Sequence, residues 1–284
     1  MRKNRNYVKN ALFMISSKEK EMSDLMENIL TVDVGNSDIV FIIYNENKDI
    51  VYKKRIPTEK NPEFYKENTF KFIKEEFKEN INLTVTSIVV PTIRENLKTS
   101  LREISNGEIV DVVPLYSGFD VGYEESKELG ADFIASGWGA LYSYKKPSII
   151  IDMGTASKIS VVDFPNKFLG GIIQPGIGQL VEIIHNNIPH LPKVQIKKPK
   201  TVIGFTTIEF IQSGIIYGAF ESLLGLSERM KIELKKDAQI IFTGGYSNLY
   251  KDEKGDFVFD FDLVNKGLYV YGKNFQQGLI EKAK

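Results

Sequence analysis

The sequence predicts an α/β protein built from two related halves. Apolar segments of strand length alternate with amphipathic segments of helical length, which is the pattern of layered α/β proteins. The order of segments restarts at Ser148, and in both halves the first strand ends in an Asp-x-Gly sequence. The restart comes after a domain-sized stretch, so it indicates a duplicated domain rather than a solenoid repeat of about 20 to 50 residues.

The first half is expected to contain three strands, a helix, a strand, a second helix and a last strand. Asn61 and Pro62 mark the start of the first helix, because Asn caps helices and Pro suits the first helical position. Phe70, Ile73 and Phe77 would form one apolar face of that helix. The expected strands cover 29–34, 39–44, 50–56, 83–91 and 108–115, and the second helix covers 94–104.

The second half repeats the three opening strands after a helix over about 126–144. The expected strands cover 148–153, 158–164, 168–176 and 238–245, and the expected helices cover 179–187, 207–234 and the end of 261–275. We therefore expect an N-terminal lobe over 29–118 and a C-terminal lobe over 119–284.

Residues 1–28 do not fit either half. Their apolar segment, 11–15, is too short for the core of a signal peptide, which needs about 7 to 15 residues. Met14, Met22 and Met26 are alternative start positions. We expect an N-terminal extension that is disordered or that results from a wrongly assigned start.

Composition excludes several classes of chemistry. The 284 residues contain 37 Lys plus Arg and 37 Asp plus Glu, so no excess positive charge points to nucleic acid. The absence of cysteine excludes disulfides, Cys-bound zinc and thiol nucleophiles, and two histidines disfavour a Ser-His-Asp or multi-His site. No apolar run reaches the roughly 18 to 20 residues of a membrane span. We expect a cytoplasmic protein without membrane or nucleic-acid partners.

Asp33-x-Gly35 and Asp152-x-Gly154 carry the first indication of a site. A carboxylate at the end of a buried strand costs free energy unless a cation or a hydrogen-bond donor satisfies it. The glycine lets a ligand approach the backbone, and the turn hydroxyls of Ser37 and Thr155 can point at phosphate oxygens. Each Asp would then face phosphate through a divalent cation. One such turn could be a simple Asp cap, but two in matching contexts favour nucleotide binding.

Gly244 and Gly245 form a third glycine-rich turn. They follow an apolar strand and precede a helical turn, where backbone amides and partial positive charge favour an anionic ligand. A Gly-Gly pair alone is most often a tight turn, but beside the two Asp-x-Gly turns it suits an adenosine pocket. The chain has neither a Walker-type P-loop nor a G-x-G-x-x-G sequence opening a helix.

These residues resemble the actin-like ATPase superfamily, and more closely the type III pantothenate kinases. The resemblance covers about 29–275 and is carried by an ordered set of motifs, DVGNS, SIVVP, ELGADF, IDMGTAS, GGIIQPGIG, HLPKV, TIEFIQSGIIYG, TGGYSNL and DLVNKGLYVYGKN. It implies a duplicated actin-like (ribonuclease H-like) ATPase fold with a nucleotide cleft between two lobes. It also implies transfer of phosphate from ATP to the primary hydroxyl of pantothenate, the first step of coenzyme A synthesis.

The resemblance also implies roles for single residues. Asp33 would reach Mg²⁺, and Asp152 would hold a monovalent cation, K⁺ or NH₄⁺. Asp132 would be the general base that accepts the proton of the pantothenate hydroxyl. ATP and its phosphates would contact Asp33, Gly35, Asn36, Ser37, Gly154, Thr155, Gly244 and Gly245, while pantothenate would contact Tyr123, Gly130, Ala131, Asp132 and, from the partner subunit of a homodimer, Thr207.

Four positions depart from the family pattern: Phe133 and Phe205 where Arg is usual, Lys158 where Thr is common, and Ser136 where Asn is usual. Phe133 cannot form the charge-assisted pair that Arg makes with the carboxylate of pantothenate. Lys158 or Lys127 is a candidate replacement for that charge. Two other interpretations stay open: a nucleotide-binding relative without turnover, and a kinase for a different small alcohol.

Overall fold

The computed structural model describes residues 28–66, 69–121 and 129–280. Within them the chain forms two units with separate cores. Unit 1 comprises the described parts of Met1–Ser143, Pro165–Lys167 and Leu263–Lys284, and unit 2 comprises Tyr144–Phe164 and Phe168–Asp262. The predicted extension, apart from Asn28, lies outside the described residues.

Unit 1 is built on a five-stranded sheet in the order β3-β2-β1-β4-β5. Strands β1, β2 and β3 pair antiparallel, whereas β4 lies parallel to β1 and β5 lies parallel to β4. Both hairpins are local, and the parallel strands enter through helical crossovers, as parallel pairing requires. Its strands are β1 (Ile29–Val34), β2 (Asp38–Tyr44), β3 (Ile50–Pro57), β4 (Leu83–Ile88) and β5 (Glu108–Asp111). The short β6 (Asp120–Val121) is instead the edge strand of the six-stranded sheet described below.

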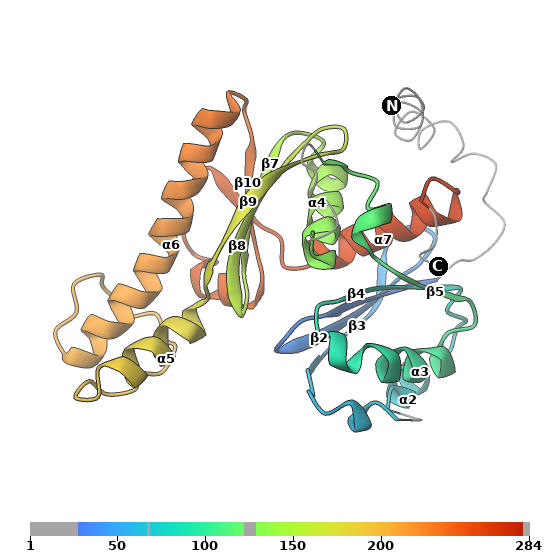
Figure 1. Cartoon of the computed structure of the whole chain (residues 1–284), viewed down its shortest axis with the longest axis horizontal. Helices are drawn as coiled ribbons and strands as arrows, with labels where there is room; N and C mark the ends of the chain where they lie inside the picture. The colour runs from blue at the N-terminus through green and yellow to red at the C-terminus, as the bar shows by residue number, and fades with distance from the viewer. Residues whose placement is uncertain (1–27, 67–68, 122–128, 281–284) are drawn as a thin grey trace. The chain divides into compact units, whose positions relative to one another are not determined.

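Helices cover both faces of this sheet (Figure 1). Helices α2 (Lys71–Glu76) and α3 (Arg94–Ile104) bury Phe70, Ile73 and Leu97 in one core with residues of β1 and β2. Helix α7 (Leu263–Gln276) packs against β1 and β4, and α4 (Ala131–Tyr144) packs against α7. The last two helices meet closely at two glycines: a Cβ atom on Gly139 would lie 2.2 Å from the Leu263 carbonyl oxygen, and one on Gly267 would lie 1.6 Å from that of Ala135.

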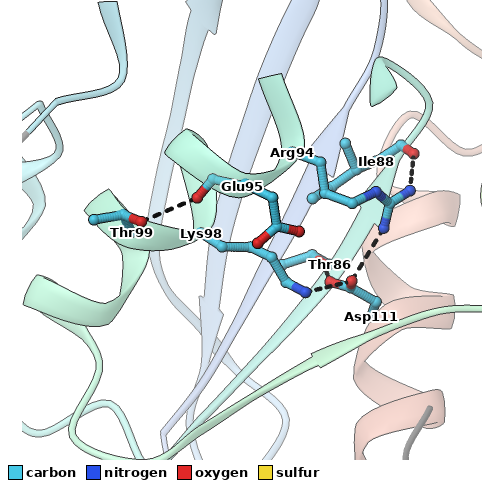
Figure 2. Close-up of polar contacts among 7 residues, drawn as sticks. All are labelled: Thr86, Ile88, Arg94, Glu95, Lys98, Thr99 and Asp111. Atoms are coloured by element: carbon cyan, nitrogen blue, oxygen red, sulfur yellow. Dashed lines mark hydrogen bonds and ion pairs between the residues drawn. The ribbon is translucent and has the colours of Figure 1, made fainter. Parts of the chain in front are cut away.

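An ion-pair cluster fixes α3 to the end of the sheet (Figure 2). Asp111 on β5 receives Arg94 at 3.0 Å and Lys98 at 2.7 Å, both from α3, and Thr86 of β4 donates to its Oδ1 at 2.5 Å. Arg94 also donates to the Ile88 carbonyl oxygen at 2.9 Å. The cluster therefore joins one helix to two parallel strands.

Unit 2 repeats the topology of unit 1. Five strands of its sheet follow the order β11-β10-β7-β8-β9. Read from the opposite edge, this order is β9-β8-β7-β10-β11, which matches β3-β2-β1-β4-β5 of unit 1 strand for strand. As in unit 1, the first two strands are antiparallel, and the last two enter parallel to the first. The expected duplication is confirmed. The strands are β7 (Ser148–Met153), β8 (Ala156–Asp163), β9 (Lys167–Pro175), β10 (Gln239–Thr243) and β11 (Phe257–Phe259).

Helices α5 (Ile177–Asn187) and α6 (Thr207–Leu234) belong to unit 2, and α6 runs alongside its sheet (Figure 1). One side of α6 packs in the core of unit 2 through Ile211, Ile215 and Phe220. Short 3₁₀ helices complete the elements: η1 (Pro62–Phe64), η2 (Pro91–Ile93) and η3 (Pro114–Tyr116) in unit 1, and η5 (Gly245–Tyr250) in unit 2. Across the described ranges, none of the helices combines the length and apolarity that a membrane crossing requires.

Most predicted elements occur within a few residues of their expected bounds, and the differences have local causes. The first helix is interrupted: Asn61 caps η1 by accepting from the Glu63 amide at 3.1 Å, and α2 is a separate short helix. The expected lobes, 29–118 and 119–284, follow sequence order. The two units follow packing instead, which groups α4 and α7 with the first sheet.

Candidate functional site

In unit 1, Asp33 occupies the last position but one of β1 and begins a tight turn into β2. The Gly35 amide donates to the Asp38 carbonyl oxygen at 2.9 Å, which closes the turn. Thr58, just after β3, holds it from outside, because its Oγ1 donates to the Gly35 carbonyl at 2.8 Å and its amide to the Ser37 carbonyl at 2.8 Å. Asn36 and Ser37 are exposed at the tip, so their polar groups can receive a ligand.

Unit 2 builds the same turn around Asp152. Strands β1 and β7 share one burial pattern, with the Asp half-buried between fully buried neighbours. The Gly154 amide donates to the Ala156 carbonyl oxygen at 3.2 Å, and Thr155 is exposed at the tip. Gly176 is the equivalent of Thr58 in unit 2. Each residue directly follows a strand that ends in proline: Thr58 follows β3, and Gly176 follows β9. Two strand ends therefore meet in each unit.

Gly176 is required by its close approach to this turn. A Cβ atom there would lie 2.3 Å from the Thr155 carbonyl oxygen and 2.5 Å from that of Gly154. Gly176 is also the N-cap of α5, and its amide donates to Gln179 Oε1 at 3.2 Å. The N-terminus of α5 thus lies against the Asp152 turn, where its free amides and partial positive charge suit a phosphate.

The glycine pair after β10 completes the cluster. Gly244 has φ +86°, a conformation that favours glycine, and its Cβ position lies 2.4 Å from Asp152 Oδ1. Gly245 is exposed and opens η5. Tyr246 then reaches α5, because a Cβ atom on Gly178 would lie 2.8 Å from its hydroxyl. Unit 2 therefore brings three chain segments, ending at Asp152, Gly176 and Gly244, to one place.

Lys158 gives Asp152 a charged partner. The two residues face each other across the β7–β8 pair, and Lys158 Nζ lies 3.0 Å from Asp152 Oδ2. Their side chains are 16% and 19% exposed, so the pair is poorly screened by solvent. An added monovalent cation on Asp152 would meet this ammonium at Oδ2 and the Gly244 backbone at Oδ1. The residues present therefore do not fit the K⁺ or NH₄⁺ expected at this aspartate.

Asp33 fits the expected divalent ion better. In the sheet register it faces Val40 on β2 and Ser87 on β4, neither of which carries a charge. Magnesium in kinase sites takes one or two carboxylates together with phosphates and water, so a half-buried carboxylate beside exposed turn residues is a suitable donor.

Asp132 lies in the first turn of α4. Its Oδ1 accepts from the Phe133 amide at 2.9 Å, and a Cβ atom on Gly130 would lie 2.6 Å from the same oxygen. The Gly130 carbonyl accepts from Ile134 at 3.2 Å, so the glycine begins the helix directly before Ala131. Asp132 is half-buried.

The predicted residues thus fall into separate groups. Unit 1 holds the Asp33 turn and the segment of Gly130, Ala131 and Asp132 at the start of α4, while unit 2 gathers the Asp152 turn with Gly244 and Gly245. Thr207 belongs to a different part of unit 2, exposed at the start of α6. Tyr123 and Lys127 lie outside the described residues.

Two glycines of this site, Gly176 and Gly178, were assigned no role from the sequence. Both belong to the GGIIQPGIG motif, and the available signal was a Pro-Gly step directly after a strand and before a helix. Such a step marks a strand end, as do the Asp-x-Gly and Gly-Gly turns, but it does not reveal which strand end it will face.

Comparison with known proteins identifies the family of the chain. A family model described as type III pantothenate kinase matches residues 29–229. The type III pantothenate kinases of Shouchella clausii (strain KSM-K16) and of Halalkalibacterium halodurans (strain ATCC BAA-125 / DSM 18197 / FERM 7344 / JCM 9153 / C-125) are each 32% identical to the chain, over 255 and 254 residues respectively. Each match covers 87% of this chain and 99% of the relative.

Among solved structures, the ethanolamine utilization protein EutJ from Carboxydothermus hydrogenoformans aligns with a TM-score of 0.52. The alignment covers 93% of this chain and all (100%) of the other, at 12% identity, so it bears on the fold alone. Together with the repeated strand order, it confirms the predicted actin-like α/β fold. By the extent of the family match and the identity to its members, the chain belongs to the type III pantothenate kinase family.

Proposed function

We propose that this chain transfers the terminal phosphoryl group of ATP to the primary hydroxyl of pantothenate, forming 4′-phosphopantothenate, the first step of coenzyme A biosynthesis. Family membership makes it a kinase, a phosphotransferase that acts on an alcohol. The observation that carries the proposal is the turn cluster of unit 2, where a Cβ on Gly244 would lie 2.4 Å from Asp152 Oδ1. Such glycine turns at strand ends admit a polyphosphate to the backbone.

The nucleotide roles divide between the two units. We assign Asp33, Gly35, Asn36 and Ser37 to one phosphate turn, with Asp33 as the ligand of Mg²⁺. When bound, the divalent ion neutralises phosphate charge. Fixing the nucleotide in unit 2 is assigned to Gly154, Thr155, Gly244 and Gly245, with the N-terminus of α5 as an additional anion-binding element.

Asp132 is assigned as the general base. Phosphoryl transfer needs alignment, charge neutralisation and an acceptor for the proton of the attacking hydroxyl, and the carboxylate of a half-buried aspartate can meet the last need. The hydrogen bond from the Phe133 amide to Asp132 Oδ1 orients the side chain. Gly130 and Ala131 would lie beside the substrate on the same segment, with Tyr123 nearby in sequence.

The carboxylate of pantothenate needs a cation that Phe133 cannot supply. Of the two lysines considered for this role, Lys158 is already paired with Asp152 at 3.0 Å. Its charge is therefore compensated, and Lys127 is the stronger candidate.

We also propose a homodimer formed through α6. Gly214, Gly218 and Gly225 lie on one exposed side of this helix, and a Cβ atom on any of them would meet nothing within 4 Å. Phe210 continues the same side and is 60% exposed, next to Phe205 at 80%. Exposed apolar groups around a glycine strip allow a second helix to pack closely. Thr207, on the same stretch, would then reach the partner's substrate.

An ADP-release assay tests the kinase proposal. The full chain is supplied with Mg-ATP in the presence or absence of pantothenate, and the product is identified by mass spectrometry. Pantothenate should stimulate ADP release and gain one phosphate. Stimulation only by another small alcohol would assign a different substrate, and ATP binding without stimulation by any alcohol would indicate a nucleotide-binding relative.

We propose a cytoplasmic location, because ATP is the phosphoryl donor.

A further inference from the structure

The ion pair at Asp152 is built into the sheet. Asp152 and Lys158 are directly opposite each other in the antiparallel register of β7 and β8, where side chains on one face are neighbours. Lys158 Nζ lies 3.0 Å from Asp152 Oδ2, and both side chains are mostly buried. The backbone of two paired strands therefore holds this ammonium beside the carboxylate. The pair is not a flexible contact on the protein surface.

The equivalent hairpin of unit 1 lacks this arrangement. There, Asp33 faces Val40 across the β1–β2 pair, so the opposing position carries no charge. The two hairpins agree in strand order, in burial and in the glycine of the turn. The lysine is thus a feature of the second hairpin and not a requirement of the hairpin fold.

The carboxylate of Asp152 has little room for another cation. Oδ2 is occupied by the ammonium, and Oδ1 lies against the Gly244 backbone, where even a methyl group would come within 2.4 Å. A second monovalent cation at Oδ2 would also be repelled by the lysine in a poorly solvated place. One positive charge already balances one negative charge.

We propose that the ammonium of Lys158 is a tethered monovalent cation for Asp152, so that phosphoryl transfer by this chain needs no added K⁺ or NH₄⁺. The proposal rests on the kinase function given above. Lys158 acts as a positioning residue: it neutralises Asp152, fixes its side chain, and lowers the repulsion between that carboxylate and the phosphates of a bound nucleotide.

The test is a cation titration of the wild-type chain and of Lys158→Thr, in Tris buffer free of K⁺ and NH₄⁺. ADP release by the wild type should be the same with or without either ion. Lys158→Thr leaves Asp152 uncompensated and should lose about 100-fold in rate, then recover with K⁺ or NH₄⁺ but not with Na⁺. A merely structural lysine would not produce this ion selectivity. Lys158→Arg keeps the charge and should stay independent of K⁺.

Lys236→Thr is the matched control. Lys236 pairs with the buried Asp163, at the opposite end of β8 from the turn. Removing this lysine also deletes an ion pair of the same sheet, but it should neither slow the reaction nor create a K⁺ requirement.

ADP affinity, measured by calorimetry with and without K⁺, is a second readout. It should depend on K⁺ in Lys158→Thr and not in the wild type. A wild type that needs K⁺ for activity, or a folded Lys158→Thr that ignores K⁺ in both measurements, would overturn the inference. If Lys158→Thr does not fold, the wild-type titration decides alone. Absence of pantothenate-dependent ADP release in every salt would instead contradict the kinase function, and the affinity titration would still test Lys158.

Discussion

The backbone of Gly244 lies against the carboxylate of Asp152, so closely that a Cβ atom on the glycine would be 2.4 Å from Asp152 Oδ1. The same glycine has φ +86°, and the same carboxylate holds Lys158 at 3.0 Å. Two strand ends that are distant in the sequence therefore determine each other's geometry. Substitutions of Gly244 or Asp152 should impair nucleotide binding more than they disturb the rest of unit 2.

Gly244→Ala should impair both stability and nucleotide binding. The alanine is strained by about 1 to 3 kcal/mol at a positive φ, and its methyl group must displace Asp152 Oδ1 or the Met153 backbone. The expected result is a higher KM for ATP together with a lower melting temperature. Steady-state kinetics and thermal unfolding measure the two effects.

Gly170→Ala separates strain from crowding. Gly170 also has a positive φ, +127°, but a Cβ atom there meets nothing within 4 Å. This variant should lose stability and keep the KM for ATP. An equal rise of KM in both variants would mean that contact with Asp152 is not the cause.

Asp132→Asn should abolish most turnover while preserving the fold. In the wild type the Phe133 amide donates to Asp132 Oδ1 at 2.9 Å, and asparagine keeps an Oδ1 acceptor for this bond. The amide group of asparagine cannot act as a base, because its nitrogen does not accept a proton. Loss of a general base lowers kcat by about 10² to 10⁴. The melting temperature and the ADP affinity should stay near the wild-type values. A kcat within a few-fold of wild type would refute the assignment.

Phe210→Asp should weaken the proposed dimer. Phe210 is 60% exposed at the start of the glycine side of α6, and an aspartate there would introduce two like charges into a symmetric interface. Loss of an aromatic anchor from an interface costs about 2 to 4 kcal/mol of association. Light scattering over a concentration series should show a dimer for the wild type and a shift toward monomer for the variant.

Leu115→Asp provides the comparison for Phe210→Asp. Leu115 is 69% exposed on η3 of unit 1, so it is an equally accessible apolar residue away from α6. Its replacement should leave the oligomeric state unchanged. A wild type that is monomeric at all concentrations would refute the dimer itself.

Asp111→Asn should destabilise the protein near neutral pH and less so in acid. Burial raises the pKa of the Asp111 carboxyl, but Lys98, Thr86 and Arg94 outweigh burial, and the net pKa is below its ordinary value. A depressed pKa contributes stability above the unfolded-state pKa of about 3.9. That contribution is lost as the pH falls through the lower folded-state pKa.

The expected loss at pH 7 is about 2 to 3 kcal/mol, because two cations would remain near the sheet without their anion. Urea unfolding between pH 3 and 7 measures it, and the difference from wild type should shrink toward pH 3. Asp237→Asn is the control: Asp237 is 83% exposed and 3.7 Å from Lys146, a surface pair worth at most about 1 kcal/mol. Equal losses in both variants would contradict the role given to the Asp111 cluster.

The sequence by itself determined the elements and their duplication. Strand β1, helix α3, strand β7 and helix α6 begin and end where the pattern of apolar residues, caps and turns places them. These bounds depend on near neighbours in the chain, which the sequence displays directly. The Asp-x-Gly turns were recognisable for the same reason, since a carboxylate and a glycine at a strand end are a local feature. The assignment of Asp132 came from the family resemblance, because an acid in the first turn of a helix is ordinary.

Only the tertiary structure decided which strand ends meet. Residues distant in the sequence place Gly176 against Thr155 and Gly244 against Asp152, and no local pattern encodes those distances. The partner of Lys158 also depended on strand register: a shift of one residue would turn its side chain to the other face of the sheet. Charge alone left Lys158 available for pantothenate, whereas the pairing of β7 with β8 gives it to Asp152.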